Sequence, residues 1–214
     1  MQSLQTLERG FVVLESIAKH QGQLTIAQLA QQLDMNRTVI YRLVHTLVEI
    51  GYVHLPDQQH LALTAKILPL YRGFEQSIPA QSQTVLEQLS EQSQAVTALV
   101  MAEGNECVVV KTACHSSSFL QLSYRLGTRH PIGVAAAGIA VACTYPAVEN
   151  ENTEIQLARK QGYAFSQNVL QIGAVGLFVP VPNRHMAIGT MGFNEIEIDQ
   201  HLPLLKQAAL NLMF

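Results

Sequence analysis

The stretch Leu33-Asp34-Met35-Asn36-Arg37-Thr38-Val39-Ile40-Tyr41-Arg42-Leu43-Val44 decides the fold of the N-terminal part of this 214-residue chain. Asn36 follows a tight turn and is of a residue type that caps the start of a helix. Gly51 is of a type that ends one. Between them, apolar residues recur at helical spacing: Ile40, Leu43, Val44 and Leu47. The sequence therefore predicts a helix that begins directly after a short turn and buries one face.

Two more helices are predicted upstream of this turn. The first has an apolar residue at every third or fourth position, namely Leu4, Leu7, Phe11, Leu14 and Ile17. Gly22 ends it, and Thr25 with Gln28 then has the form of a capping box ahead of a second apolar stripe that reaches Leu33. Three helices with a short turn between the last two form a helix-turn-helix.

The polar face of the third predicted helix favours contact with duplex DNA. It carries Arg37, Thr38, Tyr41, Arg42 and His45 in its first turns, where a recognition helix meets base edges and phosphates. The candidate DNA-binding residues also include Thr25, Asn36 and Val39. The alternative is an ordinary solvated helix face. Two arginines on one short face argue against it, because only 14% of the chain is charged.

A candidate wing follows the third helix. Two short alternating stretches, 52–55 and 60–63, flank the turn 56–59 and predict a β-hairpin. Its tip holds aspartate and glutamines rather than lysine or arginine, so we expect weak DNA contacts, made by amides and by His54 or His60. In the alternative interpretation the hairpin only covers the core of the three helices.

The rest of the chain predicts a mixed α/β fold of the α+β type. Helices are expected over 66–74 and 80–94, then strands over 96–102, 107–114 and 119–124, a small-residue helix from about 134, and a polar helix ending at Gly162. Strands over 177–182 and 186–193 and a last helix after Asp199 complete the pattern. We therefore expect three parts: a winged helix-turn-helix (1–72), a helical linker (73–94) and a small-molecule-sensing domain (95–214).

The whole chain resembles the IclR family of transcriptional regulators. The segment 33–44 resembles that family's recognition segment, and 127–132, 137–140, 162–166 and 173–180 recur in the family's order. The resemblance implies a winged helix joined by a helical linker to a GAF-like effector domain, and a homodimer or homotetramer. It also implies repression or activation of a metabolic operon under the control of a small organic acid. The DNA partner would be a double-stranded, palindromic operator.

The resemblance also places a candidate effector pocket in the second half. The residues are Ala136, Ala137, Gly138, Ser166, Gly176, Gly189 and Met191. Few of them carry hydroxyl or acidic groups, so a carboxylate would be bound mainly by backbone N–H groups near Ala136 and Ala137. The chain departs from the family where Gly138-Ile139-Ala140 replaces the usual Gly-Lys-Ala, and the stretch 142–155 is short. Arg129-His130-Pro131 is expected to form a turn that leads into the next helix, with Arg129 solvated or in a salt bridge.

Composition and missing motifs narrow the function classes. The chain is 48% hydrophobic with a net charge of −3, but residues 1–72 hold six Lys or Arg against five Asp or Glu, and residues 73–214 hold seven against eleven. Three cysteines without a CxxC pair favour the cytoplasm, and neither a membrane span nor a signal peptide is expected. Cys107, Cys114 and His115 lack the spacing of metal ligands.

No nucleophile elbow, Walker A loop or HExxH pair is present, so we expect neither an enzyme nor a cofactor or metal. Two functions stay open. The first is an effector-responsive transcription regulator, and the second is a winged-helix assembly module or ligand-binding protein without sequence-specific DNA binding.

Overall fold

The computed structural model describes residues 3–20, 22–57, 59–115, 124–193 and 195–213. Its contacts divide the chain into two compact units, Met1–Ser77 and Ile78–Phe214, called unit 1 and unit 2 below. The division lies inside the linker 73–94 that the sequence predicts.

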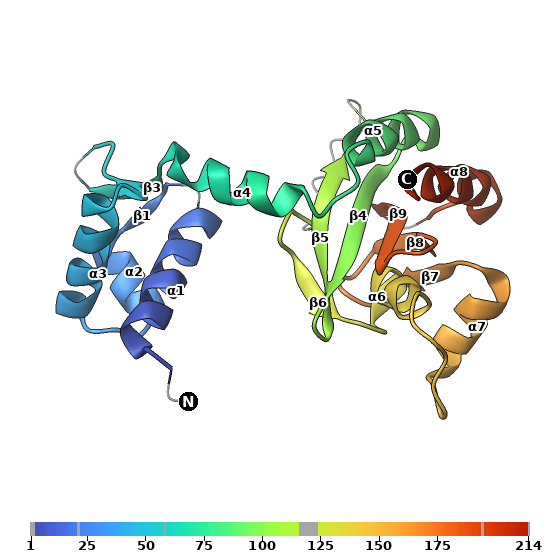
Figure 1. Ribbon diagram of the computed structural model, residues 1–214, viewed down its shortest axis with the longest axis horizontal. Coiled ribbons are helices and arrows are strands. Elements are labelled where there is room, and N and C mark those ends of the chain that lie inside the picture. The colour runs from blue at the N-terminus through green and yellow to red at the C-terminus, as the bar shows by residue number, and fades with distance from the viewer. Residues whose placement is uncertain (1–2, 21, 58, 116–123, 194, 214) are drawn as a thin grey trace. The chain divides into compact units, whose positions relative to one another are not determined.

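Unit 1 is a three-helix fold with a short sheet (Figure 1). Its helices are α1 (Gln5–Lys19), α2 (Ile26–Gln32) and α3 (Arg37–Glu49). The antiparallel strands β1 (Leu24–Thr25), β3 (His60–Leu63) and β2 (Val53–His54) lie in that order, and the short 3-10 helix η1 (Ala65–Ile67) leads into α4 (Leu68–Glu75). This arrangement confirms the predicted winged helix-turn-helix.

The helical periodicity selects the core residues of α2 and α3 correctly, but in α1 only Ile17 of the predicted stripe is buried, because Leu4, Leu7 and Phe11 are exposed and Val13 takes the core position. Ile17, Ile40 and Val44 are almost fully buried, and they pack with Leu29 of α2. Leu61, in the second strand of the hairpin, is also fully buried in this cluster. The hairpin therefore covers the helical core, and this role is independent of any contact with DNA.

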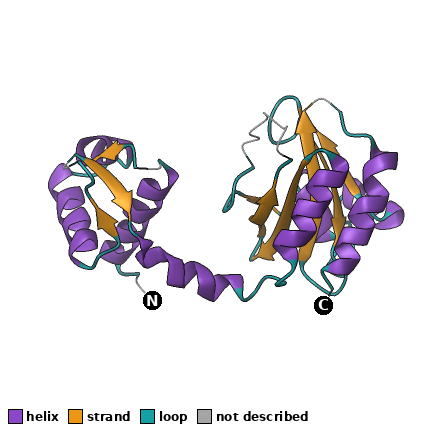
Figure 2. Ribbon diagram, turned by 90° about the horizontal axis from the view of Figure 1, so that it is seen from above, coloured by secondary structure: helices purple, strands orange, loops and turns teal. Residues whose placement is uncertain are grey.

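Unit 2 is a six-stranded antiparallel sheet with helices on both faces (Figure 2). Across the sheet the strands are β6 (Arg129–Pro131), β5 (Glu106–Ala113), β4 (Val96–Glu103), β9 (Met186–Phe193), β8 (Ala174–Pro180) and β7 (Ala164–Gln167). Helices α5 (Ser82–Ser93) and α8 (Ile198–Asn211) cover one face, and α6 (Ala135–Ala142) covers the other, next to α7 (Thr153–Gln161).

Alternation along the strands separates two hydrophobic cores. Leu99 and Leu177 point to the side of α5 and α8, whereas Val100 and Phe178 point to the side of α6. Because both faces are buried, the strands read as nearly continuous apolar runs. Helix α6 has no polar side at all, and its eight residues are buried.

Three parts of unit 2 differ from the sequence-based expectation. Arg129–Pro131 is not a turn but the edge strand β6, in which His130 lies opposite Cys107 of β5. The strand β7 was not predicted, because its four residues carry only a weak alternation. Helix α5, expected in the linker, packs against the sheet of unit 2 through Leu86 and Leu89. The strand expected over 119–124 lies outside the described residues except for its last position.

Candidate functional site

The exposed face of α3 gathers the predicted DNA-binding side chains. Arg37, Thr38, Tyr41, Arg42 and His45 are all exposed, and the opposite face of the same helix is buried. The ring centroids of Tyr41 and His45 lie 6.3 Å apart, and His45 Nδ1 lies 3.6 Å from a carboxylate oxygen of Glu49. No acidic residue occupies the first turn, so no carboxylate on the helix itself competes with an anion that approaches the positive end of its dipole.

Two of the predicted DNA-binding residues, Asn36 and Thr25, form N-terminal caps of helices. The Asn36 side-chain oxygen accepts the backbone N–H of Thr38 at 2.8 Å, which caps α3. Thr25 and Gln28 form a complete capping box at the start of α2, with the Thr25 N–H donating to the Gln28 side chain at 2.9 Å. Val39 is half-buried. These contacts fix the turn that presents α3.

The wing is organised around a carboxylate. Asp57 accepts the backbone N–H groups of His60 at 2.8 Å and Gln59 at 3.1 Å, and its other oxygen lies 2.5 Å from His60 Nδ1. The hydrogen bond from the His60 backbone is the largest cause that lowers the pKa of Asp57 far below its usual value. His54 is exposed, and His60 is held by Asp57. A negative charge at this tip opposes close approach to phosphate.

Unit 2 contains a cavity of about 300 Å³, called the unit-2 cavity below. One wall is the first turn of α6, and the opposite walls come from β8, β9 and the loop between β7 and β8. Its apolar lining includes Phe178, Met191, Val175, Val169 and Leu170. This size suits a small organic molecule.

The cavity brings together most of the predicted effector residues: Ala136, Ala137, Ser166, Gly176 and Met191 line it. Gly138 and Gly189 are not among its lining residues, because both serve close packing. A Cβ on Gly138 would lie 2.6 Å from the Pro131 carbonyl oxygen. A Cβ on Gly189 would lie 2.3 Å from the Phe178 ring.

A polar cluster at the cavity was missed by the sequence analysis. Tyr124 and His130 line the cavity, and the Tyr124 hydroxyl lies 2.9 Å from His130 Nε2. Cys107 Sγ lies 3.3 Å from both nitrogens of the same imidazole. Only the strand pairing of β5 with β6 joins Cys107 to His130, so no local sequence signal could have found this contact.

Burial controls the protonation of this cluster. Loss of solvent lowers the pKa of the His130 imidazole below its usual value and raises that of the Tyr124 hydroxyl. The same cause raises the pKa of the Cys107 thiol to about 12. All three groups are therefore uncharged at neutral pH, and Cys107 is an inert thiol rather than a nucleophile.

Arg129 is the one cationic side chain among the described residues that line the cavity. Its guanidinium is in contact with two carboxylates, Glu103 and, at 3.3 Å, Glu106. Of the two expectations for Arg129, a solvated side chain or a salt bridge, the salt bridge is the one present. The pair of carboxylates compensates its positive charge.

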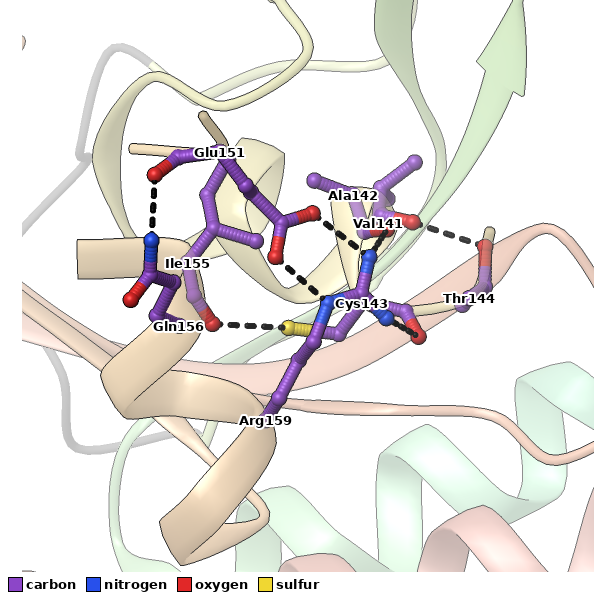
Figure 3. A network of polar contacts seen from close by, with 8 residues as sticks. All are labelled: Val141, Ala142, Cys143, Thr144, Glu151, Ile155, Gln156 and Arg159. Carbon is purple, nitrogen blue, oxygen red and sulfur yellow. Dashed lines mark hydrogen bonds and ion pairs between the residues drawn. The ribbon is translucent and has the colours of Figure 1, made fainter. Parts of the chain in front are cut away.

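The far end of α6 is held by a second polar network (Figure 3). Arg159 of α7 donates to the carbonyl oxygens of Ala142 at 3.1 Å and Cys143 at 3.0 Å, and it forms two hydrogen bonds with Glu151. The Cys143 thiol donates to the Ile155 carbonyl oxygen at 3.8 Å. Arg159 thus caps the C-terminus of the helix whose first turn lines the cavity.

Other kinds of site find no support in the described part of the chain. None of its helices is long and apolar enough to cross a membrane. Those residues also contain no cluster of three or more side chains that could hold a metal ion.

Residues 6–56 match the model of the IclR helix-turn-helix domain. The chain is 24% identical over 135 residues to the Pca regulon regulatory protein of Pseudomonas putida, an alignment that covers 62% of this chain and 46% of that protein. The chain thus aligns with about half the length of this curated relative.

Solved structures share the fold over nearly the whole chain. An IclR transcriptional regulator from Alicyclobacillus acidocaldarius superposes with a TM-score of 0.79 at 18% identity, covering 99% of this chain and 98% of that one. An IclR homologue from Microbacterium hydrocarbonoxydans, crystallised with 4-hydroxybenzoate, gives 0.77 at 16% identity, with 97% of each chain covered. These matched proteins are regulators rather than enzymes. Residues 6–56 therefore match the IclR helix-turn-helix domain, and both units share the fold of the solved IclR regulators.

Proposed function

We propose that this protein is a cytoplasmic transcription regulator whose binding to a palindromic operator is controlled by a small organic molecule in the unit-2 cavity. The exposed face of α3 carries the proposal. Five polar side chains, two of them arginines, share this face at the start of the second helix of a helix-turn-helix. A helix placed in this way enters the major groove with its N-terminal turns toward the bases.

The operator would be read by two copies of the chain. Unit 1 has an apolar groove of about 670 Å³, the unit-1 groove, which is lined by Leu4 just before α1, by Leu7 and Phe11 of α1 and by Leu70 of α4. Each of these side chains is more than half exposed in the single chain. A second copy is the occupant that we propose, because a two-fold dimer matches the two half-sites of a palindrome.

The oligomeric state tests this part of the proposal. Phe11→Glu places a charge in the unit-1 groove and is expected to convert the dimer to a monomer in analytical ultracentrifugation. Val148→Glu, at an exposed apolar residue of unit 2, is the matched control and should stay dimeric. A Phe11→Glu protein that remains a dimer would show that the copies associate elsewhere.

The effector would bind in the unit-2 cavity. The cavity is apolar over most of its surface and has few polar groups, which is typical of small-molecule sites. The resemblance implies an organic acid, and 4-hydroxybenzoate is the reference compound because a structural neighbour binds it. Coupling to DNA requires that the ligand bind the free and operator-bound forms with different affinity. Equal operator affinity with and without every bound ligand would refute this control.

Selection of bound sequences from a random duplex pool tests DNA recognition itself. The purified chain should enrich a palindrome, and the Arg37→Ala/Arg42→Ala protein should not. Arg125→Ala, which removes an exposed arginine of unit 2, should enrich the same palindrome as the unchanged chain. No enrichment by folded protein, with or without metabolites, would favour the alternative in which the helix-turn-helix only mediates assembly.

A further inference from the structure

We propose that the unit-2 cavity prefers an uncharged ligand that donates a hydrogen bond over a ligand that carries a carboxylate. This inference rests on the proposed function, in which the cavity holds the effector. It narrows the chemical class of that effector. Three independent features of the cavity lead to it.

The first feature is the absence of a net positive charge among the described lining residues. Arg129, their one cation, already contacts the carboxylates of Glu103 and Glu106. His130 is buried and uncharged at neutral pH. An anion that enters this cavity would lose its hydration and would find no cation that is free to pair with it. Such a transfer is unfavourable.

The second feature is the hydrogen bonding at the start of α6, where the resemblance would place a carboxylate. The backbone N–H of Ala136 donates to Ser166 Oγ at 2.8 Å. Ser166 of β7 therefore occupies the position in which a ligand oxygen would accept this N–H. A carboxylate would have to displace the serine hydroxyl before it could use that donor.

The third feature is the orientation of the hydrogen bonds at Tyr124. His130 Nδ1 lies 3.3 Å from the Pro131 carbonyl oxygen, which can only accept, so Nδ1 carries the proton of the neutral ring. Its Nε2 is then the acceptor of the Tyr124 hydroxyl at 2.9 Å. Because the Tyr124 hydroxyl proton is used in this hydrogen bond, its oxygen can only accept a hydrogen bond from a ligand. A hydroxyl or amide N–H of a ligand complements it, and a carboxylate opposes it.

The remaining lining suits a flat or branched apolar body. Phe178, Val175 and Met191 surround the space next to Tyr124, whose ring meets Phe178 edge-on at 6.4 Å between centroids. The class of ligand is therefore a small ring or branched chain with a hydroxyl or amide group and no charge.

A matched pair of ligands tests the inference. The pair is 4-hydroxybenzoate and 4-hydroxybenzamide, which have nearly the same shape but differ in charge. Isothermal titration of the full chain at about pH 7.5 is expected to give at least about tenfold tighter binding of the amide. Equal or tighter binding of 4-hydroxybenzoate would overturn the inference and leave the effector site itself in place.

Three variants separate this inference from the proposed function. Glu103→Gln/Glu106→Gln releases Arg129 and should reduce the disadvantage of 4-hydroxybenzoate. Tyr124→Phe should weaken the amide severalfold, because its acceptor is lost. An unaltered ratio of the two affinities in Glu103→Gln/Glu106→Gln, or an unaltered affinity for the amide in Tyr124→Phe, would show that the cause assigned to that residue is wrong. Gly176→Leu fills the cavity and should abolish binding of both compounds. Binding that survives this change would refute the effector site and the inference together. The absence of binding of either compound to the unchanged chain would have the same consequence.

Discussion

The dependence of the proposed operator binding on salt follows from how few free cations the proposed DNA-binding face of α3 presents. Arg37 and Arg42 are exposed on α3. Lys66 is engaged elsewhere, because its ammonium donates to the Ile50 carbonyl oxygen at 2.5 Å and lies 5.0 Å from the centre of the Tyr52 ring. The wing tip adds the negative charge of Asp57 rather than a cation. In the proposed complex each copy would therefore bring about two arginines to the phosphates.

The magnitude can be worked out for a dimer. Four arginine–phosphate contacts give a slope of log affinity against log salt of about −3.6. Raising the salt from about 50 to about 200 mM should then weaken operator binding about 150-fold, against roughly a thousandfold or more for proteins with six to ten such contacts. Replacing one arginine by glutamine removes two contacts from the dimer, so the slope should become shallower by about 1.8.

Fluorescence anisotropy with the selected palindrome, repeated over a series of salt concentrations, measures these slopes. Arg37→Gln and Arg42→Gln are compared with Arg125→Gln, which should keep the slope of the unchanged chain. A loss of affinity that depends on the base sequence, with little change in slope, would identify that arginine as a base contact. A slope steeper than about −7 that neither substitution alters would refute the assignment of the phosphate contacts to α3.

Three further predictions concern stability. Thr25→Ala should lower the free energy of unfolding of unit 1 by about 1 kcal/mol in urea, because the capping box is lost, and Thr25→Ser should retain most of it. Gly189→Ala should cost about 2 kcal/mol through overpacking, whereas Gly192→Ala in the same strand should cost much less, and equal effects would contradict the packing role. The hydrogen bond from Arg159 holds the pKa of Glu151 below its usual value, so the unfolded chain takes up that proton at higher pH. The stabilisation is complete above the usual glutamate pKa and is lost as the pH falls through the lowered one. Acid titration of stability should show this fall, and a Glu151→Gln protein with the same pH profile would argue against it.

Local signals made unit 1 predictable from the sequence. Helical periodicity selected the buried residues of α2 and α3 but not most of those of α1, and the caps at Thr25 and Asn36 form as their positions indicated. Both signals act within a few residues of chain, so no knowledge of the tertiary fold is needed to recognise them.

The cavity could not be predicted from the sequence alone, because it is formed by contacts between residues far apart in the chain. Ala136 and Ser166 were selected together only through the family resemblance, and their hydrogen bond joins residues 30 positions apart. His130 was missed because the pairing of β5 with β6 places it, and Tyr124 reaches the cavity only through the tertiary fold. The proline in β6 favoured a turn, although Pro131 is tolerated there because β6 is an edge strand.

The small residues of α6 limit how a protein with this cavity can adapt to a new ligand. Ala136 and Ala137 have only a methyl group each to lose, and Gly138 already lies against the Pro131 carbonyl. Mutation on this wall can therefore narrow the cavity but cannot appreciably widen it. Descendants that respond to bulkier compounds would have to shorten side chains on the opposite side, such as Phe178 or Leu170. Differences in inducer range among close homologues should accordingly follow changes in the strands and the β7–β8 loop, while α6 stays nearly constant.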